Sequence, residues 1–325
     1  MEDALTHINS HSLLLARLPS VIFGAFFLAA FYYILKGWFG RPIAYLGSIL
    51  LATTPLFLIL AHNGTPRIMY FTPVLFLAAH RVLSRAKQRP KLAAAALVIA
   101  LAFCLYVPGV IWLLIGGMIM KWRLVYKLLR NNRNTDVALM ALMLLVLIAP
   151  LMYALVIHPH LGKTLLLIPD HFPGWLQTLK DWGWMIIALF ARSRTHQDVV
   201  LGQLPLLDAA QIGLGIFGGY VMWSRLRTQF LWLIGLVLLS CLGAALNSNY
   251  SLLALGLPLL SILVGMGLRY LYIEWMHIFP RNPFPRYFAI LLMAAVVFTH
   301  VIYGVRYSLI AWPRTVAVQS LRVLK

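Results

Sequence analysis

The sequence predicts an all-α polytopic membrane protein, and two observations carry this prediction. Hydrophobic residues make up 62% of the 325 residues and charged residues only 11%, whereas soluble domains carry about 25% charged residues. Nearly uninterrupted apolar stretches alternate with short basic breaks from about Leu18 to Tyr307. Runs such as 255–268 and 290–298 are continuously apolar, which favours helices over the alternating strands of a barrel. We therefore expect a single integral membrane domain over residues 1–325.

The apolar runs predict about 10 transmembrane segments, on the scale of about 20 residues for each crossing. They lie at about 18–35, 43–61, 68–83, 92–104, 108–120, 136–157, 205–223, 229–246, 251–273 and 287–305. Of the 27 Lys and Arg, 17 fall in five breaks, which is typical of cytoplasmic loops. This placement explains the net charge of +19 by membrane topology, and it argues against a nucleic-acid partner.

The stretch Leu92–Met120 needs its own interpretation, because basic clusters flank it on both sides. Its 29 residues are too few for two full crossings. Pro108-Gly109 lies near the centre, so we expect a short hairpin or a re-entrant pair covered by protein. The alternative is a single long helix with one basic cluster misplaced.

One long loop lies on the predicted outer face, at about 158–204. Within it, residues 174–192 have the pattern of an amphipathic helix that lies in the membrane interface. Trp175, Trp182 and Trp184 would then lie at the level of the lipid headgroups.

Acidic side chains are scarce, so each one on the outer face is a candidate for chemistry. Asp170 and Asp198 lie in the long loop, and Asp208 lies just inside the next membrane segment. A carboxylate that enters the bilayer is costly and usually faces protein or water. Asp208 has two interpretations: a structural pair with an outer-face Arg, or a polar group in a site that the loop covers. These three carboxylates are the candidates for the catalytic residue, which the sequence leaves unknown.

Four arginines of the outer face are candidates for binding a lipid phosphate, namely Arg17, Arg67, Arg192 and Arg194. A guanidinium suits bidentate capture of phosphate; the alternative is that these side chains extend to lipid headgroups. His158 and His160 resemble a metal pair only weakly, because no third ligand has a supporting spacing. We predict no metal site, and dependence on a divalent metal stays open.

Short motifs follow one another in a characteristic order along residues 15–270. They are Arg17-Leu-Pro-Ser20, Phe23-Gly24, Tyr33 up to the Gly37-Trp-Phe-Gly40 turn, Leu51-Ala-Thr-Thr-Pro55, Leu105-Tyr-Val-Pro-Gly109, Gly202-Gln-Leu-Pro-Leu-Leu-Asp208, and Asn249-Tyr250 followed by Leu257-Pro258. Their order and spacing resemble the GT-C superfamily of polytopic membrane glycosyltransferases. The group they resemble includes the protein O-mannosyltransferases and the aminoarabinose transferases of lipid A.

The resemblance implies an enzyme of the plasma (inner) membrane. It would take a sugar from a polyprenyl-phosphate donor and transfer it to an acceptor lipid, glycan or protein on the outer face. The family's catalytic acid lies in a first outer loop, after a first membrane helix and before the Arg17 motif. Glu2 and Asp3 lie too close to that motif to match, so we expect an N-terminally truncated copy, a mis-assigned start or a non-catalytic relative. Two alternatives stay open: a transporter or flippase of lipid-linked precursors, and a non-catalytic membrane subunit.

Overall fold

The computed structural model describes residues 13–85, 90–120, 134–169, 171–194 and 199–314, together with residues 122 and 126. Every regular element in this part of the chain is a helix, which confirms the predicted all-α class. The elements are α2 (Leu13–Phe39), α3 (Arg41–Ala52), α4 (Pro55–His62), η1 (Pro66–Phe71), α5 (Pro73–Arg85), α6 (Pro90–Leu105), α7 (Val110–Met120), α9 (Asn134–Ile157), α10 (His160–Leu165), α11 (Trp175–Phe190), α12 (Ala209–Arg225), α13 (Arg227–Leu246), η2 (Tyr250–Leu255), α14 (Leu257–Ile278), α15 (Pro283–Val305), η3 (Arg306–Ala311) and η4 (Trp312–Arg314).

Five helices of the described chain are long and apolar enough to cross a membrane. They are residues 17–39 of α2, residues 135–157 of α9, α13, α14, and the run 283–314 that begins with α15. A sixth crossing is α3 with α4, if the pair is counted as one span bent by 66°. The structure therefore shows several membrane helices, but the predicted count of about 10 is not confirmed.

The difference in count arises where proline and glycine divide the apolar runs. The run predicted at 68–83 splits into η1 and α5, because Pro73 starts a new helix. Leu92–Met120 forms two shorter helices, α6 and α7, on either side of the predicted break at Pro108-Gly109. The alternative of a single long helix over this stretch is therefore wrong.

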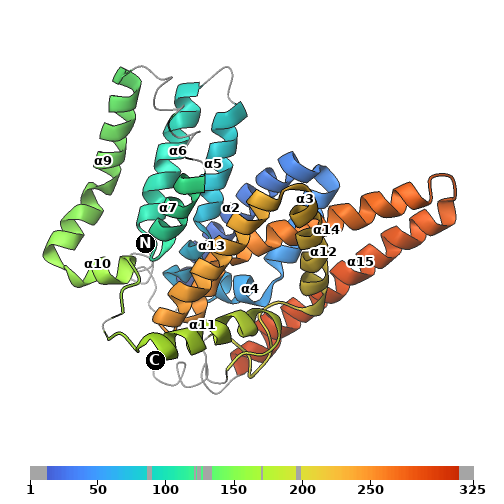
Figure 1. Cartoon of the computed structure of the whole chain (residues 1–325). Helices are drawn as coiled ribbons and strands as arrows, with labels where there is room; N and C mark the ends of the chain where they lie inside the picture. The colour runs from blue at the N-terminus through green and yellow to red at the C-terminus, as the bar shows by residue number, and fades with distance from the viewer. Residues whose placement is uncertain are drawn as a thin grey trace.

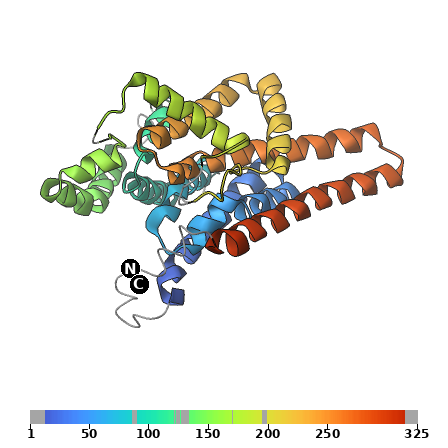
Figure 2. The same cartoon turned by 90° about the horizontal axis from the view of Figure 1, so that it is seen from below.

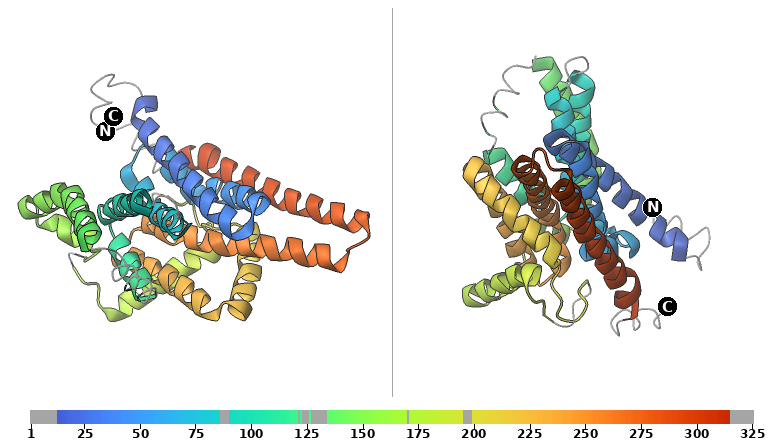
Figure 3. Two further views of the ribbon diagram at one scale, coloured as in Figure 1. Left: turned by 90° about the horizontal axis from the view of Figure 1, so that it is seen from above. Right: turned by 90° about the vertical axis from the view of Figure 1, so that its right-hand side faces the viewer.

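The helices form an elongated bundle. Figure 1 shows α5, α6 and α7 side by side, with α9 at one edge and the α14–α15 hairpin projecting from the other. The same two extremities lie far apart in the perpendicular view of Figure 2 and in the left view of Figure 3. In α9, no residue of the most apolar window is fully buried, because this helix packs at the edge of the bundle, against α6.

A close helix contact in the core joins α12 and α14. A Cβ atom added at Gly218 would lie 1.8 Å from the carbonyl oxygen of Leu263, and one added at Gly267 would lie 1.9 Å from that of Leu214. The two backbones therefore touch through glycine on both helices. Small residues allow such close approach between membrane helices.

The helix predicted at 174–192 is present as α11. Of its three indoles, Trp175 is exposed, at 83%, whereas Trp182 and Trp184 are partly buried; their level in the membrane stays a prediction. Trp182 Nε1 donates a hydrogen bond to the Leu238 carbonyl of α13, 3.0 Å away. One side of α11 thus packs on the bundle and buries Asp181.

Candidate functional site

Two short helical turns, η1 and η2, meet at the predicted outer face. Arg67 of η1 donates from Nη1 to Ser251 Oγ of η2, over 3.3 Å. Ser251 is buried, and its backbone N–H donates to Asn249 Oδ1 at 3.0 Å, which caps the start of η2. The asparagine cap and the arginine contact therefore fix one end of η2.

A second arginine reaches the same turn from the long loop. Arg194 Nη1 lies 2.8 Å from Asp181 Oδ1 of α11, and its guanidinium lies 5.1 Å from the centre of the Trp184 ring. Gln177 Nε2 donates to the other carboxylate oxygen of Asp181 at 2.9 Å. Arg194 is therefore held by an ion pair and by stacking on an aromatic face, although its side chain remains 43% exposed.

Tyr250, the first residue of η2, connects Arg194 to this turn. Burial raises the pKa of the Tyr250 phenol above its ordinary value, although the positive charge of Arg194 acts in the opposite direction. Tyr250 therefore remains a neutral phenol at physiological pH. Ser251 accepts a hydrogen bond from Arg67, and Tyr250 lies close enough to Arg194 for its charge to act on the phenol. The turn η2 therefore lies next to two arginines that are far apart in the sequence.

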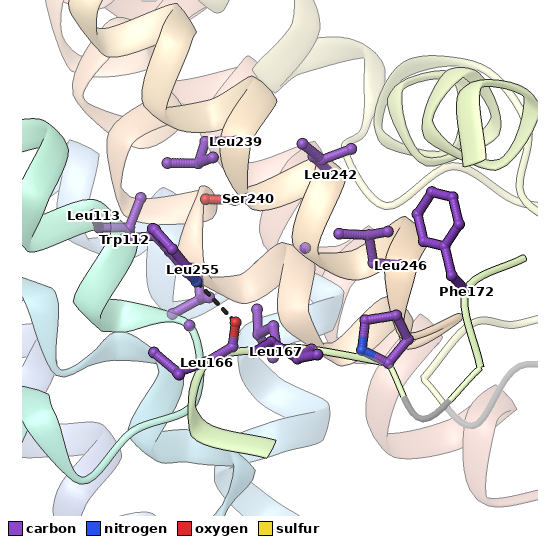
Figure 4. A pocket seen from close by; sticks show the side chains of 14 residues that line it. Trp112, Leu113, Leu166, Leu167, Phe172, Leu239, Ser240, Leu242, Leu246 and Leu255 are labelled. Carbon is purple, nitrogen blue, oxygen red and sulfur yellow. Dashed lines mark hydrogen bonds between the residues drawn. The ribbon is translucent and has the colours of Figure 1, made fainter. Parts of the chain in front are cut away.

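The other end of η2 borders an apolar cavity of about 350 Å³. Figure 4 shows leucines of α7, α13 and the segment after α10 converging on it, with Leu255 of η2 among them. Its polar groups are internally satisfied. Trp112 Nε1 donates to the Leu166 carbonyl at 2.8 Å, and Ser240 Oγ donates to the Leu236 carbonyl at 3.0 Å. The cavity can therefore hold a hydrocarbon group but offers little to a polar one.

The turn at Pro108-Gly109 shapes one wall of this cavity. Gly109 has φ +77°, and its N–H donates to the Leu165 carbonyl at 2.9 Å. An added Cβ would lie 2.5 Å from Leu167 Cδ1. Glycine is therefore required there both for the left-handed backbone and for the approach of the segment 165–167.

Asp208 occupies a different environment from the one predicted. Its Oδ1 caps α12 by accepting from the Gln211 N–H at 2.9 Å, and its Oδ2 lies 2.9 Å from His300 Nδ1 of α15. His300 is fully buried, and its Nε2 lies 2.8 Å from the Leu50 carbonyl. The structural interpretation of Asp208 is therefore favoured, but its partner is a buried histidine and not an outer-face arginine.

The Leu50 carbonyl is available because α3 ends next to it. Beyond Ala52 the chain bends into α4, and the Leu50 oxygen accepts from Thr54 Oγ1 at 2.7 Å and from Gln211 Nε2 at 3.3 Å, in addition to facing His300. Buried backbone groups at a helix break need such partners in a membrane. Asp208, Gln211 and His300 thus stabilise the broken helix.

Arg67 and Arg194 at η2 form what we call the arginine cluster. Within the described residues, the remaining sequence candidates do not join it. Arg17 is half-buried in α2 and Arg192 is exposed after α11; neither has a described hydrogen bond or ion pair from its side chain. Asp170 and Asp198 lie outside the described residues. The rings of His158 and His160 lie 5.7 Å apart, and the described chain holds no group of three His, Cys, Asp or Glu that could bind a metal.

Sequence reasoning missed Asp181, Trp184, Tyr250 and Ser251 as members of the site. A signal existed for Asp181, which lies four residues after Gln177 and is the only acidic residue of α11. For Tyr250 and Ser251, the Asn-Tyr pair marked a turn but did not indicate which cations it would contact.

One comparison with known proteins gives a match. Residues 2–153 match the model of the family described as dolichyl-phosphate-mannose-protein mannosyltransferase. No curated protein matches the chain. The matched residues include Arg67 and the turn at Gly109, whereas α11, Arg194 and η2 lie beyond them.

Proposed function

Because residues 2–153 are a domain of the dolichyl-phosphate-mannose-protein mannosyltransferase family, a family of membrane glycosyltransferases of the GT-C type, we propose the following function. The chain transfers a sugar from a polyprenyl-phosphate donor to a lipid, glycan or protein acceptor on the outer face of the plasma (inner) membrane. Several long apolar helices agree with an integral membrane enzyme.

The observation that supports the donor class is the position of η2 between two different environments. Its first two residues contact or lie near Arg67 and Arg194, and its last residue, Leu255, lines the apolar cavity. Six residues of 3₁₀-helix span about 12 Å. A ligand with a phosphate at one end and a hydrocarbon chain at the other matches this arrangement.

The arginines would act on the phosphate. When the sugar leaves the donor, negative charge increases on the phosphate oxygens, and fixed cations at that position stabilise the transition state. Arg194 is already oriented by Asp181 and Trp184, so little ordering is required when the donor binds. Arg17 and Arg192 would contact the same phosphate only after rearrangement.

Asp208 is poorly suited to act as the general base, because both of its carboxylate oxygens have partners. Asp170 and Asp198 remain the candidates on the long loop for accepting a proton from the acceptor hydroxyl. A divalent metal would require ligands beyond those that the described residues bring together.

The test is donor binding and sugar transfer by the full chain in lipid nanodiscs. We expect the double variant Arg67→Ala/Arg194→Ala to bind a polyprenyl-phosphate sugar at least about tenfold more weakly, because it loses two charged hydrogen-bond donors. Arg225→Ala, an exposed arginine at the end of α12, is the matched control. Unchanged donor binding in a folded double variant would contradict the proposed site.

A separate readout distinguishes transfer from transport. Labelled sugar should appear on an acceptor when wild-type protein and donor are mixed. Movement of labelled donor across vesicles without any transfer would favour a flippase, and neither activity would favour a non-catalytic subunit.

A further inference from the structure

A buried arginine lies at the end of α2, away from the arginine cluster of η1 and η2. Arg81 of α5 is only 6% exposed. Its guanidinium packs against Gly37, where an added Cβ would lie 1.5 Å from Nη2, and lies 5.9 Å from the centre of the Trp38 ring. Gly37 therefore provides the space that the guanidinium occupies, in the last turns of α2.

The charge of Arg81 has no counter-ion among the described residues. Its Nε and Nη2 are buried without a hydrogen-bond partner, and it forms no ion pair in this part of the chain. Two further cations lie in the same region: Arg85 follows on α5, and Arg269 of α14 donates to the Trp38 carbonyl at 3.1 Å. A buried guanidinium without compensation is costly.

No acid in the described part of the chain forms an ion pair with Arg81. Residues 86–89 and 121–133, which follow α5 and α7, contain no acid. Asp136 lies 3.1 Å from Lys91, and Asp181 and Asp208 pair with Arg194 and His300. Glu274 of α14 forms no ion pair within the described part of the chain. An anion from outside the chain can therefore supply the charge that these acids do not.

We propose that Arg81, with the end of α2, forms a binding site for a phosphate-bearing anion, and that this anion is the headgroup of an anionic membrane lipid. Nε and Nη2 of Arg81 are the buried donors that such an anion would satisfy. Lys36 in the last turn of α2 and Arg41 at the start of α3 add two further cations close in sequence to Gly37. Arginine is well suited to phosphate, and a tryptophan such as Trp38, 44% exposed, is typical of the headgroup region.

The site is independent of the proposed sugar transfer and is tested without it. The full chain is purified in phosphatidylcholine nanodiscs, and its thermal unfolding is measured before and after part of the lipid is replaced by phosphatidylglycerol. A parallel series adds inorganic phosphate to the phosphatidylcholine sample. Bound lipid is counted by native mass spectrometry.

The wild type should be stabilised by phosphatidylglycerol and should retain it, because a ligand that binds only the folded state raises its stability. Arg81→Gln should lose this retention by about tenfold. In phosphatidylcholine alone it should unfold no earlier than the wild type, because it removes an uncompensated buried charge. Arg225→Gln makes the same change of charge at an exposed position and should behave as the wild type.

A second pair of variants leaves the arginine in place. Gly37→Ala should displace the guanidinium and weaken retention of phosphatidylglycerol, whereas Gly117→Ala, where an added Cβ meets no atom within 4 Å, should not. Stabilisation by inorganic phosphate that depends on Arg81 would assign the site to a soluble phosphate. The proposal is overturned if Arg81→Gln and Arg225→Gln retain lipid and respond to phosphate equally.

Discussion

Asp208 Oδ2 and His300 Nδ1 lie 2.9 Å apart, and the other ring nitrogen of His300 lies 2.8 Å from the Leu50 carbonyl. From its place in α15, the buried ring of His300 therefore contacts both the residue that caps α12 and the carbonyl end of α3. These contacts join three helices inside a membrane protein.

Breaking this pair should destabilise the protein strongly. His300→Ala leaves the carboxylate of Asp208 without its buried partner, and we expect a loss of about 3–5 kcal/mol in the free energy of unfolding. Unfolding in mixed detergent micelles measures the change. His277→Ala, an exposed histidine in the last turn of α14, is the control.

The same pair can be tested for coupling. Asp208→Asn keeps an oxygen to cap α12 but removes the charge. The double variant Asp208→Asn/His300→Ala should therefore lose less stability than the sum of the two single variants. Additive losses would show that the two side chains act separately.

Gly218→Ala should disrupt the contact between α12 and α14, because its Cβ would overlap the Leu263 carbonyl. Overpacking of this kind lowers stability by about 1–3 kcal/mol. Gly213→Ala lies on the same helix, meets no atom within 4 Å and should be neutral or slightly stabilising. Equal unfolding midpoints for the two variants would contradict the described packing.

Ionisation of Tyr250 should contribute to loss of stability at alkaline pH. Burial raises its pKa in the folded state above the ordinary value of 10.0 for a tyrosine, so below pH 10 both states keep the proton and no stability is lost. Above pH 10 the unfolded state releases the proton first, which lowers the free energy of unfolding. Tyr250→Phe should therefore lose less stability between pH 8 and pH 11 than Tyr153→Phe, which replaces a tyrosine that is 70% exposed. Parallel pH curves for the two variants would be inconsistent with a buried phenol at this position.

Filling the apolar cavity should weaken binding of long-chain donors selectively. Leu246→Trp places a larger ring among the lining residues. We expect the affinity for a long polyprenyl-phosphate sugar to fall at least about tenfold, since several buried methylene groups lose their contacts, while a short-chain donor changes little. Leu176→Trp, on the exposed side of α11, should affect neither. Isothermal titration with both donors makes the comparison, and an equal loss for both would argue against the cavity as the chain site.

The apolar runs predicted where most helices lie, because a helix in lipid requires a continuous apolar sequence. They did not predict how many helices cross the membrane. Pro55 and Pro73 each begin a new helix within an apolar run that, by composition, looks continuous. The arginines Arg67 and Arg194 could be chosen by residue type and position. The contacts that these arginines make could not be predicted, because Ser251 lies 184 residues from Arg67 in the chain. Likewise, the pairing of Asp208 with His300 depends on how α12 and α15 pack, which no local pattern records.

The bend between α3 and α4 has a consequence for how the chain can be divided. A Cβ at Gly304 would lie 1.7 Å from the Thr53 carbonyl, so α15 presses directly on the bend. The Leu50 carbonyl at this bend is thus contacted by Gln211 and His300, which lie more than 150 positions later in the chain. Residues 2–153, which match the family model, lack Gln211, His300 and Gly304, so on their own they would leave the bend without these contacts.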